Sequence, residues 1–312
     1  MSGTMSSNDV IRSTAIYQRT TKDILLGILK GIGEFFRLMA RNRTGFIGFI
    51  IVVLYFVVSF LGPYVIPVDK ETKVTRIFEK PSWQHPLGMD HEGRDTFSQV
   101  VNGGRDILTT ALLTALISTA IGVTLGALSA VLGGGIDTLL SAFADIFMSI
   151  PQFPLQVVLA GFIQVKSMLI LSLILAILSW PGLYRAVRAQ VLSLRERDYV
   201  EAAILLDLGT WHIVFKEILP NMMSYIAISF AFSMTGAIYA QTGLVLLGLV
   251  PFSSHNWGVM ISIAWTRGAI FYRDSAAYIL APVFTIALFQ LAMVWMTRSL
   301  EEVFNPRLRG RA

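Results

Sequence analysis

Two histidines and two aspartates lie close together in one polar stretch and are the first candidates for chemistry. His85 and His91 could ligate a metal ion, and Asp90 and Asp95 could form a carboxylate pair for acid–base catalysis. No third ligand follows at a spacing typical of metal sites, so a turn histidine and a surface histidine are the favoured interpretation. The two aspartates are expected instead to cap a short helix that starts near Gly93.

Other catalytic patterns are missing from the sequence. It contains no glycine-rich phosphate loop ending in Gly-Lys-Ser/Thr, no His-Glu-x-x-His motif and no serine framed as a nucleophile elbow. It also contains no cysteine, which excludes disulfides and thiolate metal sites. We therefore expect a chain that is not an enzyme and that holds no cofactor or metal ion of its own.

The composition points to a membrane protein. Of the 312 residues, 54% are hydrophobic and only 14% are charged, whereas ordinary soluble domains carry about 25% charged residues. Several apolar runs reach the ~20 residues that a membrane-spanning helix needs. The net charge of +5 then reflects Lys and Arg in cytoplasmic loops rather than binding to nucleic acid. The expected fold class is an all-α membrane protein.

The apolar runs predict six membrane spans. They lie at about 45–66, 107–132, 136–163, 168–187, 221–249 and 277–297. Gly133, Gly134 and Gly135 predict a tight turn after the second span, because glycine reaches left-handed conformations at low cost. Pro151 and Pro154 interrupt the third span, so a kinked or broken helix is expected there.

The chain divides into a leading segment and one six-span domain. Residues 1–44 combine a polar tail, without the apolar core of a signal peptide, and an amphipathic interfacial helix at 24–40. Residues 45–312 form the membrane domain. Its main polar parts are the extracytoplasmic segment 67–106, the loop 195–220 and the basic tail 298–312.

The distribution of basic residues predicts the orientation. Six spans place both termini on one side, and most of the 25 Lys and Arg residues fall on that side, in residues 1–45, 185–220 and 298–312. By the positive-inside rule this side is the cytoplasm. We therefore expect a multi-pass protein of the cytoplasmic membrane with both termini and the 195–220 loop in the cytoplasm.

The cytoplasmic segment 199–221 is richer in structure than a simple connection needs. Helix formers from Glu201 onward are followed by a break at Asp207-Leu208-Gly209. A second helix is expected to resume at Thr210, as its N-cap, and to stop before Pro220. Two short helices around a sharp turn would present a shaped surface to a partner.

This segment resembles the "EAA" loop of importer-type ABC permeases. Glu201-Ala202-Ala203, the turn four residues later and Leu219-Pro220 match its pattern, except that Asp207 replaces the usual glycine and Gly209 follows. Asp tolerates the left-handed conformation better than most residues, so the turn either stays at Asp207 or moves to Gly209. In that family the loop docks into the cytoplasmic ATPase. The resemblance assigns the ATPase contact to Glu201, Ala202, Ala203, Leu206, Asp207, Leu208, Gly209 and Thr210.

Four further stretches narrow the resemblance to the dipeptide, oligopeptide and nickel group of these permeases, and to its C-type subunit. They are Arg41-Asn42-Arg43, residues 85–105, Gly248-Leu249 with Asn256-Trp257-Gly258, and Asn305-Pro306-Arg307-Leu308-Arg309. Within residues 85–105 the chain has Met89 where Thr is usual and Gly104 where Ala is usual. The group implies a second permease subunit, two ATPase subunits that bind ATP and Mg²⁺, and an extracytoplasmic solute-binding protein. Its substrates include peptides, nickel and oligosaccharides.

Polar residues inside the spans are candidates for the pathway itself. Asp145 in the third span should face the bundle, paired with Arg185 or Arg188, because an unpaired carboxylate is costly in a bilayer; proton coupling is the alternative. Candidates to line a passage are Gln152, Gln156, Ser229, Ser233 and Gln241. Hydrogen bonding between helices would explain the same residues.

Three other functions remain to be compared with an ATP-driven permease. An ion-coupled secondary transporter would show internal repeats and several intramembrane acids, and neither is evident. A membrane-embedded enzyme lacks a recognisable catalytic constellation. A membrane scaffold without transport activity is compatible with the sequence.

Overall fold

The computed structural model describes residues 33–250 and 255–304, which form helices and loops without a β-strand. In these ranges five helices are long and apolar enough to cross a membrane, and a bent helix pair gives a sixth candidate. The expectation of an all-α membrane fold is confirmed. The expected tail 1–23, most of the expected interfacial helix 24–40 and residues 305–312 of the basic tail lie outside the described residues.

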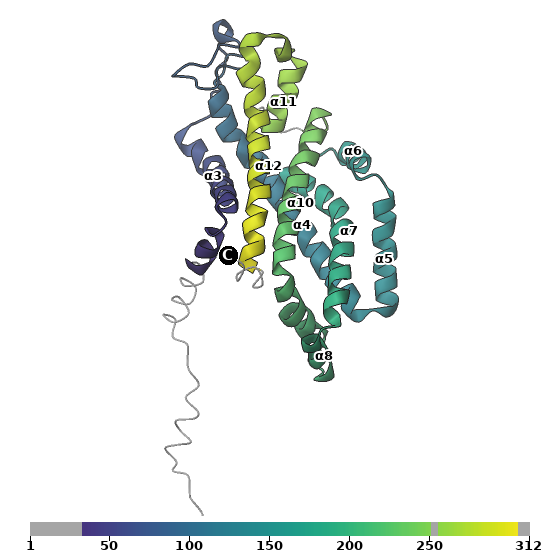
Figure 1. The fold of residues 1–312 in the computed structure, drawn as a ribbon. Helices are drawn as coiled ribbons and strands as arrows, with labels where there is room; N and C mark the ends of the chain where they lie inside the picture. The colour runs from purple at the N-terminus through teal and green to yellow at the C-terminus, as the bar shows by residue number, and fades with distance from the viewer. Residues whose placement is uncertain (1–32, 251–254, 305–312) are drawn as a thin grey trace, which may run out of the picture.

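Five long helices form the bundle. They are α3 (Arg43–Val65), α4 (Thr96–Leu132), α7 (Met168–Arg195), α10 (Met223–Leu246) and α12 (Ala276–Phe304). The shorter helices are α5 (Gly134–Ser149), α6 (Gln152–Ile163), α8 (Asp198–Leu205), α9 (Thr210–His212) and α11 (Trp257–Thr266). Single turns and irregular helix are η1 (Val74–Arg76), η2 (Ile213–Ile218), η3 (Leu219–Met222), η4 (Ala269–Phe271) and η5 (Arg273–Ser275). Figure 1 shows α8 at one end of the bundle and the polar loop before α4 at the other.

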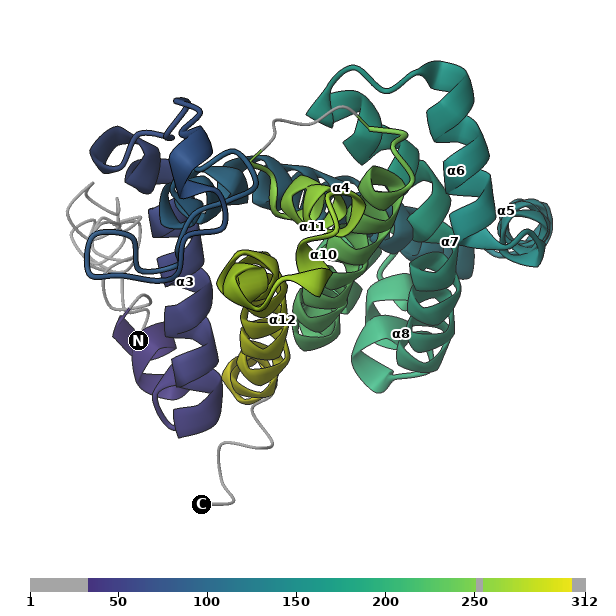
Figure 2. The same cartoon turned by 90° about the horizontal axis from the view of Figure 1, so that it is seen from above.

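The long helix α4 is the centre of the packing. It lies against α3, α7 and α10, while Figure 2 shows α3 at one side of the molecule and α5 and α6 at the other. Ile107 and Ala111 of α4 belong to the largest buried cluster, together with Trp257 of α11 and Phe289 of α12. Small residues such as Ala111 let helix backbones approach closely, which is the usual source of packing energy between membrane helices.

The second span begins earlier than the expected residue 107. α4 starts at Thr96, where the Asp95 carboxylate accepts a hydrogen bond from the Ser98 backbone N–H at 2.7 Å. Residues 96–106 are too polar to register as an apolar run, yet they continue the helix beyond the hydrophobic region. Asp90 is not a helix cap: it is fully buried and accepts from the Gln99 amide at 2.8 Å. The helix expected to start near Gly93 thus starts at Thr96, and it is the beginning of the long α4 rather than a separate short helix.

The third span is broken, as its prolines predict. α5 and α6 meet at an angle of 84°, and Pro151 is the N-cap of α6. The glycine turn before α5 is also present, with positive φ at Gly133 (64°) and Gly134 (59°). Glycine is needed there because other residues are strained in this region.

Gly104→Ala is expected to destabilise the protein, although alanine is usual at this position in the resembling family. An added Cβ would collide with the Ser59 hydroxyl and lie 2.8 Å from the Trp257 ring. Overpacking of this kind costs about 1–3 kcal/mol. The thermal unfolding midpoint of the purified protein in detergent measures the effect. Ser59→Gly should recover part of the loss in the double variant, and an unchanged midpoint for Gly104→Ala would contradict this packing.

Candidate functional site: an exposed helical tip and a cavity between four helices

The segment 195–220 forms two helices around a turn, but the second does not stop before Pro220. From Thr210 to Leu246 the chain is one continuous helical stretch. It changes from α-helix to π-helix at Ile213 and to 3₁₀-helix at Leu219. This change of hydrogen-bond register accommodates Pro220, which lies in the first turn of η3 where its missing N–H costs little. The expected break before Pro220 is therefore wrong, and α9 is joined to α10 without an intervening loop.

The turn between α8 and α9 uses both positions that the sequence offers. Asp207 has a φ of 49°, and Gly209 has φ 75° and ψ 150°. Asp207 thus occupies the left-handed region that aspartate tolerates. Gly209, rather than Thr210, is the N-cap residue of α9, so the expected capping role of Thr210 is wrong. Thr210 is the first helical residue instead.

α8 is anchored to the bundle by apolar contacts. Val200 and Ala203 are buried in a cluster with Val187 and Val191 of α7 and with residues of α4 and η2. Ala203, one of the residues expected to contact a partner, therefore packs inward. These buried apolar contacts hold α8 against the end of α7 and against η2.

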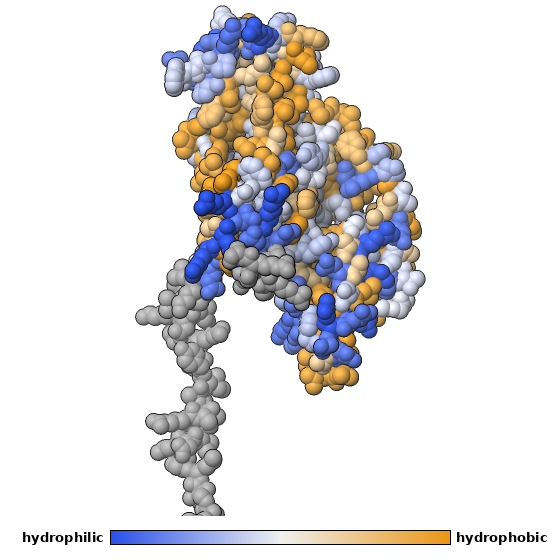
Figure 3. Space-filling model, in the orientation of Figure 1, coloured by the Kyte–Doolittle hydropathy of each residue, from blue (hydrophilic) through white to orange (hydrophobic). Residues whose placement is uncertain are grey.

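The outer side of this segment is apolar and exposed. The tip surface consists of Ile204, Leu205, Leu206, Leu208, Trp211 and Phe215. Leu205 is 80% exposed and Trp211, stacked on Phe215 with ring centroids 5.1 Å apart, is 64% exposed. Figure 3 shows this apolar end protruding below a polar zone. An exposed patch of large apolar residues rimmed by polar ones is typical of an interaction site.

The sequence prediction for the tip was incomplete. Leu206, Asp207, Leu208 and Gly209 are exposed there as expected, but Leu205 and the Trp211–Phe215 pair were missed. The sequence contains a signal for them, because large apolar side chains recur in the segment 195–220, which is too polar to be a membrane span.

Glu201 and Ala202 lie on the exposed side of α8. Glu201 is in the first turn, where a carboxylate interacts favourably with the helix dipole. In the described part of the chain it makes no ion pair, so its position fits an exposed charge or a contact to another subunit.

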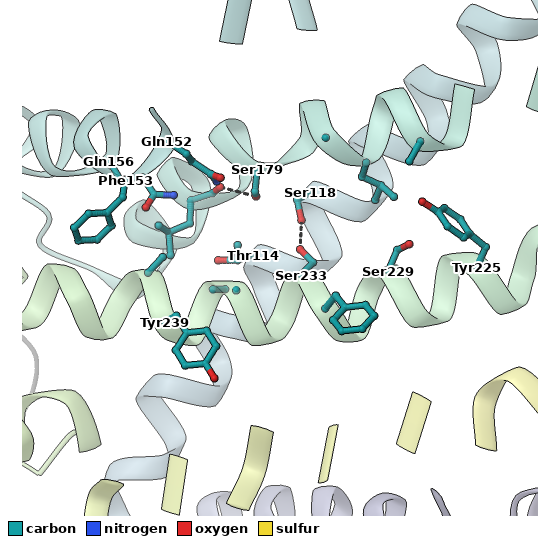
Figure 4. Close-up of a pocket in the computed structure, with 18 residues that line it drawn as sticks. Thr114, Ser118, Gln152, Phe153, Gln156, Ser179, Tyr225, Ser229, Ser233 and Tyr239 are labelled. Atoms are coloured by element: carbon teal, nitrogen blue, oxygen red, sulfur yellow. Dashed lines mark hydrogen bonds between the residues drawn. The ribbon is translucent and has the colours of Figure 1, made fainter. Parts of the chain in front are cut away.

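A cavity of about 580 Å³ lies between α4, α6, α7 and α10. Its polar lining comes from hydroxyl and amide side chains, and Figure 4 shows them projecting from all four helices. They are Thr114, Ser118, Gln152, Gln156, Ser179, Tyr225, Ser229, Ser233 and Tyr239. Among the described residues that line it, none carries a charge. Ser118 of α4 and Ser233 of α10 are joined by a hydrogen bond of 2.7 Å.

Four of the five residues expected to line a passage meet at this cavity. Gln152, Gln156, Ser229 and Ser233 contribute to its wall. Gln241 does not: it is buried and donates from Nε2 to the Ile107 carbonyl of α4 at 2.9 Å. The structure therefore places Gln241 in a hydrogen bond between helices, the alternative that the sequence left open.

The α4 contribution to the cavity was not predicted. Thr110, Thr114 and Ser118 recur at intervals of four residues, which places them on one face of a helix. Thr114 and Ser118 line the cavity, and the buried Thr110 carbonyl accepts a hydrogen bond from Ser172 at 3.3 Å. This spacing was the signal that could have identified the face.

The two histidines of the polar loop have separate partners. His85 Nδ1 lies 2.9 Å from the Asp95 carboxylate, and His91 packs beside the Tyr278 ring at 6.0 Å between centroids. Burial lowers the pKa of His91, which favours its neutral form. No group of three potential His, Cys, Asp or Glu ligands is found in the described residues. These histidines thus organise the loop rather than a common site.

Asp145 pairs with Arg185 of α7, one of the two partners expected for it. Arg188, the other, pairs with Asp137 of α5 instead. The Asp145 and Arg185 side chains are more than half exposed, so the pair faces the outside of this chain rather than the bundle interior. The expectation that Asp145 faces the bundle is therefore wrong.

Comparison with known proteins extends over most of the chain. A family described as "Binding-protein-dependent transport system inner membrane component" matches residues 122–310. The chain is 31% identical to a putative peptide permease protein of Brucella ovis, over 86% of this chain and 88% of the relative. It is 30% identical to the dipeptide transport system permease protein DppC of Bacillus subtilis, over 88% and 85%. It is also 30% identical to the oligopeptide transport system permease protein OppC of that organism, over 86% and 87%.

Proposed function

Because the chain belongs to the binding-protein-dependent inner-membrane permeases of ABC importers, in their dipeptide and oligopeptide group, we propose that it forms half of a peptide pathway driven by separate ATPase subunits. It is a multi-pass protein of the cytoplasmic membrane. The residues that would carry the function lie in the tip surface and in the cavity wall.

One observation carries this proposal: the exposed apolar tip is joined directly to helices that wall the cavity. α8 packs on the end of α7, and α9 continues without a break into α10. α7 and α10 both contribute residues to the cavity. A partner that binds the tip and moves it would therefore move two walls of the cavity. The partner we propose is a cytoplasmic ATPase that binds ATP and Mg²⁺.

The cavity wall supports a peptide substrate among those that the resemblance allows. Hydroxyl and amide groups such as Gln152, Gln156 and Ser229 can exchange hydrogen bonds with peptide amides. The described lining offers no His, Cys or carboxylate, the ligands that nickel would prefer. Relatives are named for peptide, dipeptide and oligopeptide transport. A wall without charge also suits peptides whose side chains differ in charge.

The assembly that follows contains three kinds of partner. A second permease subunit would complete the pathway, because the cavity opens at the surface of this chain. Two ATPase subunits would bind the tips of the two permeases, and a solute-binding protein would deliver the peptide from outside. This arrangement requires the tip and both termini in the cytoplasm, as the distribution of basic residues predicts.

Reconstitution tests the proposed function directly. The chain, its candidate second permease and ATPases are co-purified and placed in liposomes with the binding protein outside and ATP inside. We expect uptake of labelled di- to pentapeptides that requires ATP, and no uptake of nickel. Peptide uptake in the absence of the ATPases, or driven by an ion gradient alone, would contradict the proposal.

Leu205→Glu should weaken the association with the ATPase by about tenfold, since a central apolar contact typically contributes one to two kcal/mol or more. Leu205 is 80% exposed and makes no contribution to the buried core, so folding should be unaffected. Affinity is measured by titrating labelled ATPase onto the permease in nanodiscs. Val74→Glu, at a highly exposed apolar position in the polar loop at the other end of the molecule, is the matched control. Equal affinity for the wild type and Leu205→Glu would exclude Leu205 from the contact.

A further inference from the structure

α5 is only loosely embedded in the bundle. Ala144 is its one buried residue in the described structure, while Leu139 and Ile146 are exposed. Its contact face lies against α7, where Ala144 packs with Trp180 and Tyr184. Figure 2 shows α5 at the edge of the molecule. Because its apolar contacts are few, polar contacts have a large share in setting its position.

One carboxylate links α5 to two other helices. Arg188 of α7 donates from Nε and Nη2 to the two carboxylate oxygens of Asp137, at 2.5 Å each. Ser129 of α4 donates to the same carboxylate, and the Tyr184 hydroxyl lies 2.7 Å from Ser129 Oγ. Ser129, Asp137, Tyr184 and Arg188 are called the α5 joint below.

The ion pair of the α5 joint is expected to be strong, because it is partly buried and bidentate. The Asp137 and Arg188 side chains are only 18% and 30% exposed. Two parallel hydrogen bonds from a guanidinium fix both the distance and the angle of the contact. Because both side chains are mostly buried, loss of one partner leaves the other charge poorly solvated. The neighbouring Asp145–Arg185 pair is exposed and contributes less.

The α5 joint also lies between the two parts of the candidate site. At the end of α7, Val191 packs against Val200 of α8, so α7 carries the tip. At the other end of α5, the chain bends by 84° into α6, whose first residues Gln152 and Phe153 line the cavity. A continuous set of contacts thus runs from the tip through α7 and α5 to the α6 wall.

We propose that the Asp137–Arg188 ion pair is a positioning contact that makes α5 and α6 follow α7 when the tip is displaced. α6 also packs directly on α7, and α5 has a few apolar contacts to it. Without the ion pair these contacts remain, but α5 and the α6 wall with Gln152 follow α7 less closely. The proposal rests on the proposed function for the source of the movement, an ATPase at the tip. Asp137 and Arg188 touch neither substrate nor nucleotide in this role.

Exchanging the charges of Asp137 and Arg188 tests whether the contact between them, rather than either residue alone, is needed for uptake. In the complete complex, Asp137→Asn should lower peptide uptake by about tenfold while ATP hydrolysis continues, in line with the coupling energies of single contacts. The double variant Asp137→Arg with Arg188→Asp should restore much of the uptake. Asp274→Asn, which breaks an exposed ion pair with Lys80, is the matched control and should transport normally.

A distance measurement gives a second readout that stability alone would not change. The chain has no cysteine, so Gln152→Cys and Leu192→Cys can carry spin labels on α6 and α7 without background. Between the nucleotide-free and vanadate-trapped complexes we expect the label distance to stay nearly constant in the parent chain, because α6 follows α7, and to change with Asp137→Asn.

Each outcome decides the proposal. Wild-type uptake by Asp137→Asn, a label distance that stays as constant in that variant as in the parent chain, or an assembled charge-exchange variant without recovery would overturn it. If Asp137→Asn fails to assemble, Arg188→Lys decides, because lysine keeps the charge but cannot make the paired contact; wild-type uptake would again overturn the positioning role. Absence of uptake by the wild-type complex would contradict the proposed function alone, since the distance measurement still tests the α5 joint.

Discussion

Gly209→Val is expected to lower ATP-driven peptide uptake by about ten- to a hundredfold, with ATP hydrolysis retained. Gly209 has φ 75° and ψ 150°, a conformation that is almost exclusive to glycine. A β-branched residue there costs about 1–3 kcal/mol in strain, which the turn must relieve by reorganising. Apart from its chain neighbours, no atom lies within 4 Å of the place that a Cβ would occupy, so the effect arises from the backbone and not from a clash.

The reorganised turn would change how α8 and α9 present the tip surface. Val200 and Ala203 still hold α8 on α7, and α9 still continues into α10, so insertion and folding should be preserved. The ATPase would then meet a displaced set of apolar side chains. Uptake and ATP hydrolysis by the same proteoliposomes measure the degree of coupling.

Asp207→Gly is the matched control for this turn. Asp207 has φ 49°, which glycine adopts without strain, and the resembling family usually has glycine there. We expect wild-type coupling for Asp207→Gly. Normal uptake by Gly209→Val would mean that the turn conformation has no part in coupling.

The parts of the fold that depend on local chemistry were predictable. The prolines of the third span lack an N–H, which favours an interruption of the helix, and the break between α5 and α6 falls at Pro151. A single proline does not require a break, since Pro181 and Pro282 lie inside α7 and α12. The turn at Gly133 and the left-handed Asp207 follow from the few residues that tolerate positive φ. These features need only the neighbouring residues.

The parts that depend on distant residues were not predictable. Pro220 lies within a continuous helix because the π-helical turn before it shifts the hydrogen bonds, and nothing in the local sequence distinguishes this from a helix end. The start of α4 at Thr96 depends on the loop that folds over Asp90. Hydropathy identifies only the apolar part of a helix that lies in the bilayer, whereas α4 continues into the polar residues 96–106.

The same limit applies to the cavity. Gln156 and Gln241 are both amides on apolar helices, and the sequence gives no reason to separate them. Gln241 donates from Nε2 to a backbone carbonyl of α4, whereas Gln156 lies in the cavity wall; the Oε1 atoms of both lack a protein partner among the described residues. Which role an intramembrane amide takes is decided by the neighbouring helix, so it requires the three-dimensional packing.

Gly236→Trp is expected to block peptide uptake by about a hundredfold, because passage through a pore depends on its free diameter. Gly236 lies on the α10 wall of the cavity, and an added Cβ there meets no atom within 4 Å. The indole ring would therefore extend into the space where the peptide passes. Assembly with the ATPases should be unchanged, since the tip lies at the far end of the helical stretch that includes α10.

Gly135→Trp provides the matched control for Gly236→Trp. Gly135 is an exposed helical glycine that also has no atom within 4 Å of an added Cβ, but it lies outside the cavity. Uptake of labelled peptide and ATP hydrolysis are measured for both variants. We expect loss of uptake with continued hydrolysis only for Gly236→Trp. Because the obstruction requires no change in fold or assembly, full uptake by an assembled Gly236→Trp complex would place the peptide route elsewhere in the assembly.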